Sequence, residues 1–299
     1  MPIYYPDILE RKTKPRTFTY REKDVMLYAL GIGMGRNPMD ERELSFLDEK
    51  NLKVVPTAAT VLAWGMGRRA DPVLDKKTGL RTSELDLLTL VHGEQKVELH
   101  KSLPSVGTFT TTTRTIGAYD KGKNKGAIVV EETVWIDKAG EKVVTLIGTT
   151  FARGDGGFGG PSKGGPEPHP VPTRKPDLSI PFETRVDQAL LYRLNGDLNP
   201  LHSDPNVAKR AGYPRPILHG LCTFGITCRA VLQEYCDYDT SRIVSHQARF
   251  SAPVFPGETI VVDLWQDGDV ISTEARVLER GVRVIKNGKT VLRGVVGPE

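Results

Sequence analysis

The chain has 299 residues, of which 38% are hydrophobic and 26% are charged, and its formal net charge is +4. This composition is typical of a globular protein of about two domains. The small net charge, without a basic block, argues against nucleic acid as the main partner. No stretch reaches the about 18 consecutive apolar residues of a membrane span.

The chain ends and the cysteines bear on the cellular compartment. The first residues lack the apolar core of a secretion signal, and the last three are not an SKL-type peroxisomal address. Cys222, Cys228 and Cys236 lie close together without a C-x-x-C pair, which is typical of reduced core thiols. We therefore expect an intracellular protein.

The first half is expected to begin with a helix that has a counterpart later in the chain. At an offset of 164, Phe18–Leu30 aligns without gaps on Phe182–Leu194, with five identities. The alignment indicates an internal duplication. Beyond it, Gly33 stands opposite Asp197, so only the second half carries the polar cluster described below.

Strand-like runs dominate the rest of each half. They lie at 88–103, 107–119, 127–136 and 141–152 in the first half, and at 242–254, 258–266, 270–279 and 290–297 in the second. Short turn sequences, DKAG at 137–140 and KNG at 286–288, predict antiparallel ladders.

A change of composition divides the chain between the halves. From Gly154 to Pro176, 13 of 23 residues are glycine or proline, and such a run cannot hold a helix or a central strand. It predicts a linker or surface loop. We expect an N-terminal half over residues 1–153, a linker over 154–177 and a C-terminal half over 178–299.

Two helices are predicted in the second half. Val186, Ala189, Leu190 and Leu194 recur at helical spacing and form an apolar stripe. Residues 217–236 are apolar nearly all round, which indicates a buried helix. One long buried helix with a series of strands predicts an α+β fold in which a sheet wraps around the helix.

The sequence NGDLNPLHSDP at 195–205 gathers polar side chains between the two helices. Asp204 precedes a proline, which predicts an N-cap for a short helix that ends at Gly212. Asp197, Asn199 and His202 leave three alternatives open. They could form a polar surface turn, a metal site without a clear complete ligand shell, or an acid–base pair that holds a water molecule.

A second motif, LHG at 218–220, stands directly before the buried helix. A glycine at a helix N-terminus exposes its N–H and lets a ligand approach, and the helix dipole there favours negative charge. Gly220 is therefore either an oxyanion site or a simple turn into the helix. His219 is given no catalytic role, and its ring is expected to anchor the turn.

Together these motifs resemble the MaoC-like hydratases, most of all the hydratase 2 module of peroxisomal multifunctional β-oxidation enzymes. The resemblance runs through LYRLNGDLNPLHSDPNVAKRAGYPRPILHGLCTFG, ARFSAPVFPGETI and the first-half motifs LYALGIG, VHGEQ, YDKG and GGFGG. It covers essentially the whole chain. It implies a double hot-dog fold, in which each half is a curved antiparallel sheet around a helix and the helix of the first half is shortened.

The resemblance also implies an activity, the (3R)-specific hydration of trans-2-enoyl-CoA in β-oxidation. It places the catalytic residues at Asp197, Asn199 and His202 and the oxyanion donor at Gly220. The residues expected to contact the substrate are His92, Gly93, Lys121, Leu198, Pro200, Leu201 and Phe250, with Arg249 added as a candidate for the CoA phosphates. It implies no metal or other cofactor, no membrane partner, a homodimer and a peroxisomal location. The alternatives are a (3R)-hydroxyacyl-carrier-protein dehydratase and a non-catalytic acyl-CoA binding module.

Overall fold

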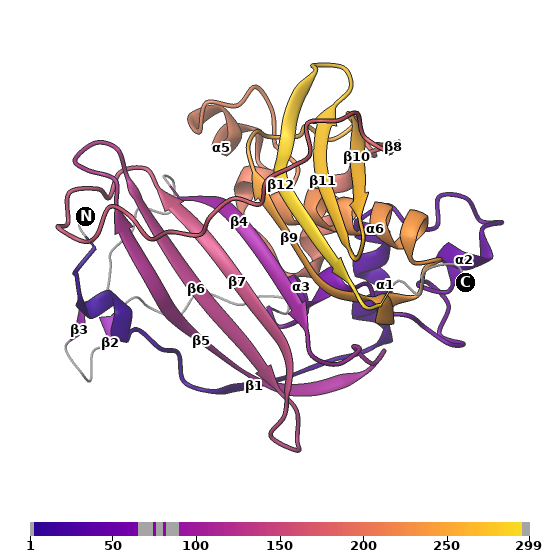
Figure 1. Ribbon diagram of the computed structural model, residues 1–299, viewed down its shortest axis with the longest axis horizontal. Helices are drawn as coiled ribbons and strands as arrows, with labels where there is room; N and C mark the ends of the chain where they lie inside the picture. The colour runs from indigo at the N-terminus through magenta and orange to yellow at the C-terminus, as the bar shows by residue number, and fades with distance from the viewer. Residues whose placement is uncertain (1–2, 65–73, 76–79, 82–89, 295–299) are drawn as a thin grey trace.

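The computed structural model describes residues 3–64, 74–75, 80–81 and 90–294. One ten-stranded antiparallel sheet forms its frame, in the order β1-β5-β6-β7-β4-β9-β12-β11-β10-β8 (Figure 1). The strands are β1 (Arg16–Tyr20), β4 (Leu90–Leu99), β5 (Gly107–Asp120), β6 (Ala127–Ile136), β7 (Lys142–Ala152), β8 (Leu178–Glu183), β9 (Ile243–Phe250), β10 (Thr259–Asp267), β11 (Val270–Val277) and β12 (Val282–Leu292), with a separate pair β2 (Leu74–Asp75) and β3 (Leu80–Arg81).

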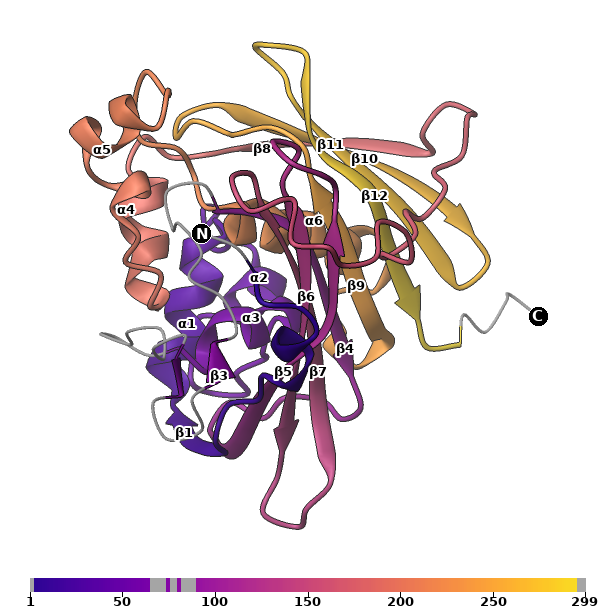
Figure 2. The same cartoon turned by 90° about the vertical axis from the view of Figure 1, so that its left-hand side faces the viewer.

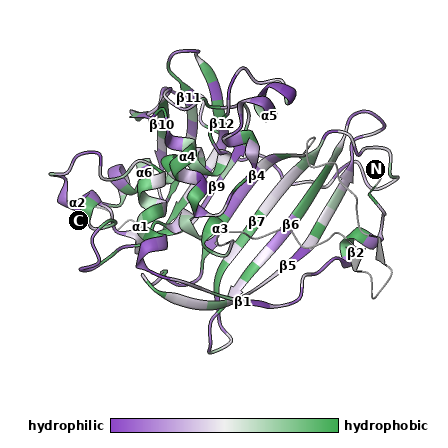
Figure 3. Ribbon diagram, turned by 180° about the vertical axis from the view of Figure 1, so that it is seen from behind, coloured by the Kyte–Doolittle hydropathy of each residue, from purple (hydrophilic) through white to green (hydrophobic). Residues whose placement is uncertain are grey.

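The helices are short, with one exception. The α-helices are α1 (Glu22–Gly31), α2 (Glu41–Leu44), α3 (Ala59–Leu62), α4 (Gln188–Tyr192), α5 (Pro205–Arg210) and α6 (Gly220–Tyr235); the 3-10 turns are η1 (Asp7–Glu10), η2 (Pro56–Ala58), η3 (Arg193–Asn195), η4 (Pro200–His202) and η5 (Thr240–Arg242). Seen from behind, α1, α4 and α6 lie on one face of the sheet (Figure 3). Within the described ranges, no helix has the length and apolar character needed to cross a bilayer.

The two halves meet in the middle of the sheet. The five strands from β1 to β4 in the sheet order come from the first half and the five from β9 to β8 come from the second. The halves join where β4 pairs antiparallel with β9, from Glu94 opposite Arg249 to Glu98 opposite Ser245. Each half is a curved antiparallel sheet with its helical segments on the inner face (Figure 2), so the predicted double hot-dog fold is confirmed.

The helix α6 forms the centre of the core. Eleven of its sixteen residues are buried, from Leu221 through Cys228 and from Ala230 through Leu232. This agrees with the prediction of a helix that is apolar nearly all round. In the first half, the described part of the corresponding segment, residues 56–64, holds η2 and the four-residue α3. Its remainder lies outside the described residues, so the expected shortening of this helix stays a prediction.

The offset of 164 between the halves holds beyond the aligned helices. Asp40 caps α2 as Asp204 caps α5, and each carboxylate accepts the backbone N–H two residues ahead. Val55 before η2 has φ −63° and ψ 127°, and His219 before α6 has φ −59° and ψ 134°. The backbone conformation is therefore the same in both halves even where the side chain differs, as at Val55 and His219.

Two sequence predictions are wrong in detail. The helix α4 forms, but three of the four residues of its predicted stripe face solvent: Val186, Leu190 and Leu194 are 84%, 53% and 41% exposed. The fourth, Ala189, is buried together with Gln188 and Tyr192, because α4 packs beside α1 (Figure 2) and the buried Tyr192 and Tyr28 rings meet at 6.0 Å.

The other wrong prediction is the KNG turn. The sequence at 286–288 lies inside β12, and the pairing of β12 with β9 shifts register between Lys286 and Lys289. Asn287 adopts φ 54°, a left-handed conformation that asparagine tolerates well. A turn-like sequence therefore produces a β-bulge here.

The glycine- and proline-rich segment between β7 and β8 crosses the outer face of the sheet (Figure 1). Asp120 at the end of β5 anchors its start, because the carboxylate accepts the N–H groups of Gly157 and Gly159 at 2.8 Å each. Near its end, the Trp265 indole N–H donates to the Arg174 carbonyl at 2.9 Å. The bonds of Asp120 thus join the YDKG motif to the GGFGG motif in space.

A buried ion pair occupies the first-half position that corresponds to the polar cluster. Arg229 of α6 donates from Nε to Glu43 at 2.8 Å and from Nη1 to the Gly33 carbonyl at 2.9 Å. The Arg229 and Glu43 side chains are only 11% and 5% exposed. Gly33 is the counterpart of Asp197, so an internal ion pair stands where the second half has its polar groups.

Removing one partner of this pair is expected to destabilise the protein strongly. Glu43→Ala leaves the Arg229 guanidinium buried without its counter-ion, and we expect the free energy of unfolding to fall by about 3–5 kcal/mol. Urea denaturation measures the change. Glu132→Ala, which breaks a pair with the exposed Arg114, is the control and should have a much smaller effect. Equal effects of the two variants would contradict the importance of the buried pair.

Candidate active site

The polar loop between α4 and α5 is built by local hydrogen bonds. Gly196 takes φ 114° after η3 and turns the chain toward Asp197. The Asp197 carboxylate accepts the N–H of Asn199 at 3.2 Å, and the Asn199 side chain accepts the N–H of Leu201 at 3.0 Å. Asn199 therefore caps η4, and this cap fixes the position of His202 relative to Asp197.

Three side chains converge at this loop and at the start of α6. Asp197, His202 and His219 each place a nitrogen or a carboxylate oxygen within 4.8 Å of the others. His202 is 8% exposed and His219 is 1% exposed, while Asp197 is partly exposed. The predicted meeting of a carboxylate and an imidazole is present, and a second imidazole lies beside them.

Hydrogen bonds to carbonyl groups define the tautomers of both rings. Nδ1 of His202 lies 2.9 Å from the Ile217 carbonyl, and Nε2 of His219 lies 3.2 Å from the Asp197 carbonyl. A carbonyl only accepts, so both of these nitrogens carry hydrogen. Nε2 of His202 is therefore left with its lone pair, as a proton acceptor requires.

Burial keeps both imidazoles neutral. It lowers the pKa of His202 below the ordinary 6.5, against weaker raising effects of the Ile217 carbonyl and the Asp197 carboxylate. Burial also lowers the pKa of His219 to about 2, and the neighbouring His202 adds to the shift. Near neutral pH the site thus offers a neutral imidazole as a base.

The start of α6 lies directly beside this group. Gly220 is the first residue of α6 and follows His219. The backbone N–H groups of Gly220 and Leu221 have no acceptor within the part of the chain that the structure describes. An unpaired N–H at the positive end of a 16-residue helix is suited to bind an oxygen that gains negative charge.

Two predicted substrate contacts complete the inner face of the site. The His92 ring of β4 and the Phe250 ring of β9 lie 4.9 Å apart, and the Asp197 charge acts on His92, whose pKa is lowered mainly by burial. A Cβ atom on Gly220 would lie 3.2 Å from the Phe250 ring. Phe250 and Gly220 are thus in close contact, and glycine leaves the approach to the helix N-terminus open.

The other predicted contacts fall in two places. Leu198, Pro200 and Leu201 belong to the polar loop itself; Leu198 and Pro200 are exposed and Leu201 is half-buried. Gly93 lies at a register shift in β4, where a Cβ atom would lie 3.2 Å from the Thr149 carbonyl. A bulge of this kind redirects the neighbouring His92 side chain.

Lys121 is not brought to this group of residues. It follows β5, which is three strand spacings, or about 14 Å, from β4 across the sheet. Its ammonium group donates to the Ser162 carbonyl of the linker at 2.8 Å. Lys121 thus contacts the linker, and its predicted contact with CoA stays a prediction.

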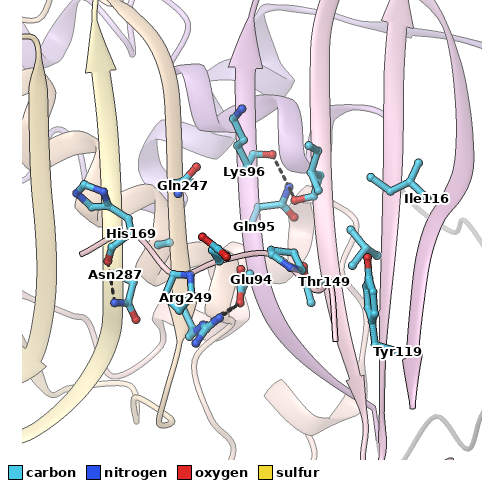
Figure 4. Close-up of a pocket in the computed structure, with 17 residues that line it drawn as sticks. Glu94, Gln95, Lys96, Ile116, Tyr119, Thr149, His169, Gln247, Arg249 and Asn287 are labelled. Atoms are coloured by element: carbon cyan, nitrogen blue, oxygen red, sulfur yellow. Dashed lines mark hydrogen bonds and ion pairs between the residues drawn. The ribbon is translucent and has the colours of Figure 1, made fainter. Parts of the chain in front are cut away.

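Arg249 lies on the opposite face of the sheet from the site. Neighbouring residues of a strand point to opposite faces, so Arg249 faces outward where Phe250 faces inward. Its Nε donates to Glu94 at 2.8 Å (Figure 4). Both line a pocket of about 310 Å³ between the sheet and the linker, together with Gln95, Lys96, Ile116, Tyr119, Val130, Ile147, Thr149, Gly164, Pro166, Glu167, Pro168, His169, Gln247, Ala248 and Asn287.

The stacked rings are unfavourable for a metal ion. The His202 and His219 rings are 3.7 Å apart and inclined by only 25°. The nitrogen lone pairs lie in the ring planes, so they point side by side and do not converge on one ion at about 2.1 Å from each. One nitrogen of each ring also donates to a carbonyl already. The geometry favours acid–base chemistry.

His219 was not among the residues predicted to act in catalysis. The structure places its ring against two of the predicted catalytic residues, the His202 ring and the Asp197 backbone carbonyl. A signal was present in the sequence, because His219 stands next to Gly220 and its counterpart at the offset of 164 is Val55. The expected role as an anchor of the turn agrees with its bond to the Asp197 carbonyl.

Comparison with known proteins gives matches in both halves. Residues 168–288 match the MaoC like domain, and residues 18–154 match the MFE-2 hydratase 2 N-terminal domain. The enoyl-CoA hydratase ChsH3 of Mycobacterium tuberculosis is 39% identical over 296 residues, which cover 99% of this chain and 98% of that protein. The peroxisomal multifunctional enzyme type 2 of Drosophila melanogaster is 39% identical over 280 residues, which cover 92% of this chain and 46% of that enzyme.

Solved structures agree with these matches. The crystal structure of a MaoC-like dehydratase from Phytophthora capsici superposes with a TM-score of 0.83 at 36% identity, over 96% of this chain and 98% of that one. Similarity therefore extends over both halves, the linker and the polar loop. The chain belongs to the MaoC-like hydratase 2 family.

Proposed function

We propose that this protein is an enoyl-CoA hydratase 2, which adds water to trans-2-enoyl-CoA and forms (3R)-3-hydroxyacyl-CoA. Its similarity to a named enoyl-CoA hydratase over nearly the full chain supports this activity. The observation that carries the proposal is the group formed by Asp197, His202 and the free N–H of Gly220 at the start of α6. These three groups can activate water beside a thioester and stabilise its carbonyl oxygen.

The proposed reaction assigns one task to each group. Nε2 of neutral His202 removes a proton from a water molecule that Asp197 orients. The water oxygen then bonds to the third carbon, and the electron pair of the double bond moves onto the thioester oxygen. The Gly220 N–H stabilises that negative charge. Protonated His202 finally returns the proton to the second carbon on the same face, so that the overall change is the addition of one water molecule.

The remaining site residues are proposed to bind the substrate. His92, Phe250 and the loop residues Leu198, Pro200 and Leu201 line the approach to the reacting carbons, and Gly93 sets the direction of His92. Asn199 acts through its cap on η4, which holds His202. Loss of this geometry by about 1 Å would lower the rate severely.

We further propose that the protein acts in β-oxidation, that it is located in peroxisomes and that it forms a homodimer. Support for the compartment comes from the similarity to a peroxisomal multifunctional enzyme, of which this chain covers 46%. The homodimer follows from the family resemblance.

A hydration assay tests the activity directly. We expect purified protein to bleach the ultraviolet absorbance of short, medium and long trans-2-enoyl-CoA esters and to yield the (3R) alcohol in chiral analysis. Carrier-protein esters are assayed in parallel. Faster turnover of those esters would show a carrier-protein dehydratase, and binding without turnover would show an acyl-CoA binding module; either result would overturn the proposal.

Replacing either member of the acid–base pair by an amide is expected to remove most of the activity. His202→Gln removes the base, and Asp197→Asn removes the carboxylate that orients the water, so each should lower kcat by about 10²–10⁴-fold while the fold is kept. Steady-state kinetics and thermal unfolding measure the two effects. Asp204→Asn is the matched control in the same loop, since asparagine also caps helices well. Wild-type turnover in Asp197→Asn or His202→Gln would contradict the catalytic role of that residue.

The oxyanion donor can be removed by a substitution that keeps the local backbone conformation. Proline fits the first position of a helix, and the first half already has Pro56 at the counterpart of Gly220. Gly220→Pro removes the N–H and should lower kcat by about 10²–10³-fold. Gly220→Ala adds a Cβ atom near Phe250 but keeps the N–H, so it separates crowding from loss of the donor. If both variants lose the same activity, the N–H is not the oxyanion donor.

A further inference from the structure

We propose that His219 is a positioning residue, which holds Asp197 and His202 in their working geometry through its two faces and its ring N–H. The inference rests on the proposed hydratase function, because it concerns the same reaction. His219 is buried just before α6. It makes two contacts with the acid–base pair and also affects the protonation of His202.

The first contact holds the backbone of Asp197. The Nε2–H of His219 donates to the Asp197 carbonyl at 3.2 Å, across 22 residues of sequence. The loop at Asp197 is only partly buried, and its other support is the local turn that Asn199 closes. The imidazole of His219 therefore ties the catalytic carboxylate to the rigid end of α6.

The second contact holds the ring of His202. The two imidazoles stack at 3.7 Å with an angle of 25°, and the Tyr192 ring lies 5.0 Å from His219. Among the described residues, the His202 ring makes one hydrogen bond, from Nδ1 to the Ile217 carbonyl, and this bond alone allows the ring to tilt. The flat face of His219 restricts that tilt and keeps Nε2 of His202 directed at the water.

The third effect is on the charge of His202. Three titratable or charged side chains lie around the two stacked imidazoles. Asp197 comes from the polar loop, Arg193 from η3 and His92 from β4. His219 itself adds no charge near neutral pH, because burial lowers its pKa to about 2. It covers one face of His202 and keeps water away, and a less hydrated imidazole is harder to protonate.

The duplicated half provides an internal comparison. Along the shared offset, Asp197 has become Gly33, Gly220 has become Pro56 and His219 has become Val55. The tyrosines at the interface of the two helices, Tyr28 and Tyr192, are kept in both halves and are both fully buried. The backbone around Val55 matches that around His219, so the fold does not need a histidine there. His219 occurs only in the half that has the catalytic group.

Three variants separate the contacts of His219. His219→Phe keeps an aromatic face and loses the donor, His219→Gln keeps a donor and loses the stack, and His219→Val copies the first half. The matched control is His246→Val. His246 is also a fully buried histidine against α6, bonded to Thr290 and Thr227, and it does not touch the acid–base pair.

We expect each His219 variant to lower kcat by about 10–100-fold, with less than a threefold change in KM. In the wild type, kcat/KM should fall on the acid side with an apparent pKa below 6.5, the ordinary histidine value, because burial makes His202 harder to protonate. In His219→Val and His219→Gln, His202 is more hydrated, so this acidic limb should move to higher pH. His246→Val should lower stability without moving the limb or kcat.

Nuclear magnetic resonance of the histidine ring nitrogens gives a readout that does not depend on turnover. It should show Nδ1 of His202 protonated in the wild type and a raised pKa of His202 in His219→Val and His219→Gln. If His219→Val does not fold, the other two variants decide. Unchanged kcat and an unmoved His202 titration would overturn the role of His219, as would an equal loss in His246→Val. A wild type that hydrates no enoyl thioester while the His202 shift is present would overturn the proposed function alone.

Discussion

The antiparallel pairing of β4 with β9 is the constraint on which the rest of the structure depends. It joins two five-stranded sheets into one and brings His92 of the first half against Phe250 of the second. The inner face of the joined sheet then encloses α6, and the N-terminus of that helix lies where the two halves meet. A site that neither half could build alone follows from this single strand pairing.

Much of the fold and of the site could be predicted from the sequence, because these features depend on residues that are near one another in the chain. The strands, the buried α6 and the Asp204 cap follow from periodicity and capping chemistry, and Asp197 and His202 lie together as their motif predicts. The one helix whose buried face was predicted wrongly shows a tertiary effect: α4 buries Tyr192 rather than Leu190 because α1 packs beside it. The positions of Lys121 at the linker and of Arg249 on the outer face depend on strand order and on the course of the linker, which the sequence does not give.

The comparison of the two halves shows how function and fold separate after a duplication. Caps, helix starts and the central tyrosines recur at the same offset, so the backbone is maintained by packing. Gly33, Val55 and Pro56 show that the first half lacks the chemical groups of the second at the corresponding positions. Position-by-position comparison within one chain thus distinguishes side chains that the fold needs from side chains that the chemistry needs.

The ion pair between Glu43 and Arg229 makes each half of the molecule depend on the other. Arg229 belongs to the helix of the second half and Glu43 to the first, so each half now carries a buried charge that only the other can neutralise. Either half expressed alone would keep one of these charges without its counter-ion, at a cost in stability that the joined chain avoids. The two halves are therefore no longer independent folding units.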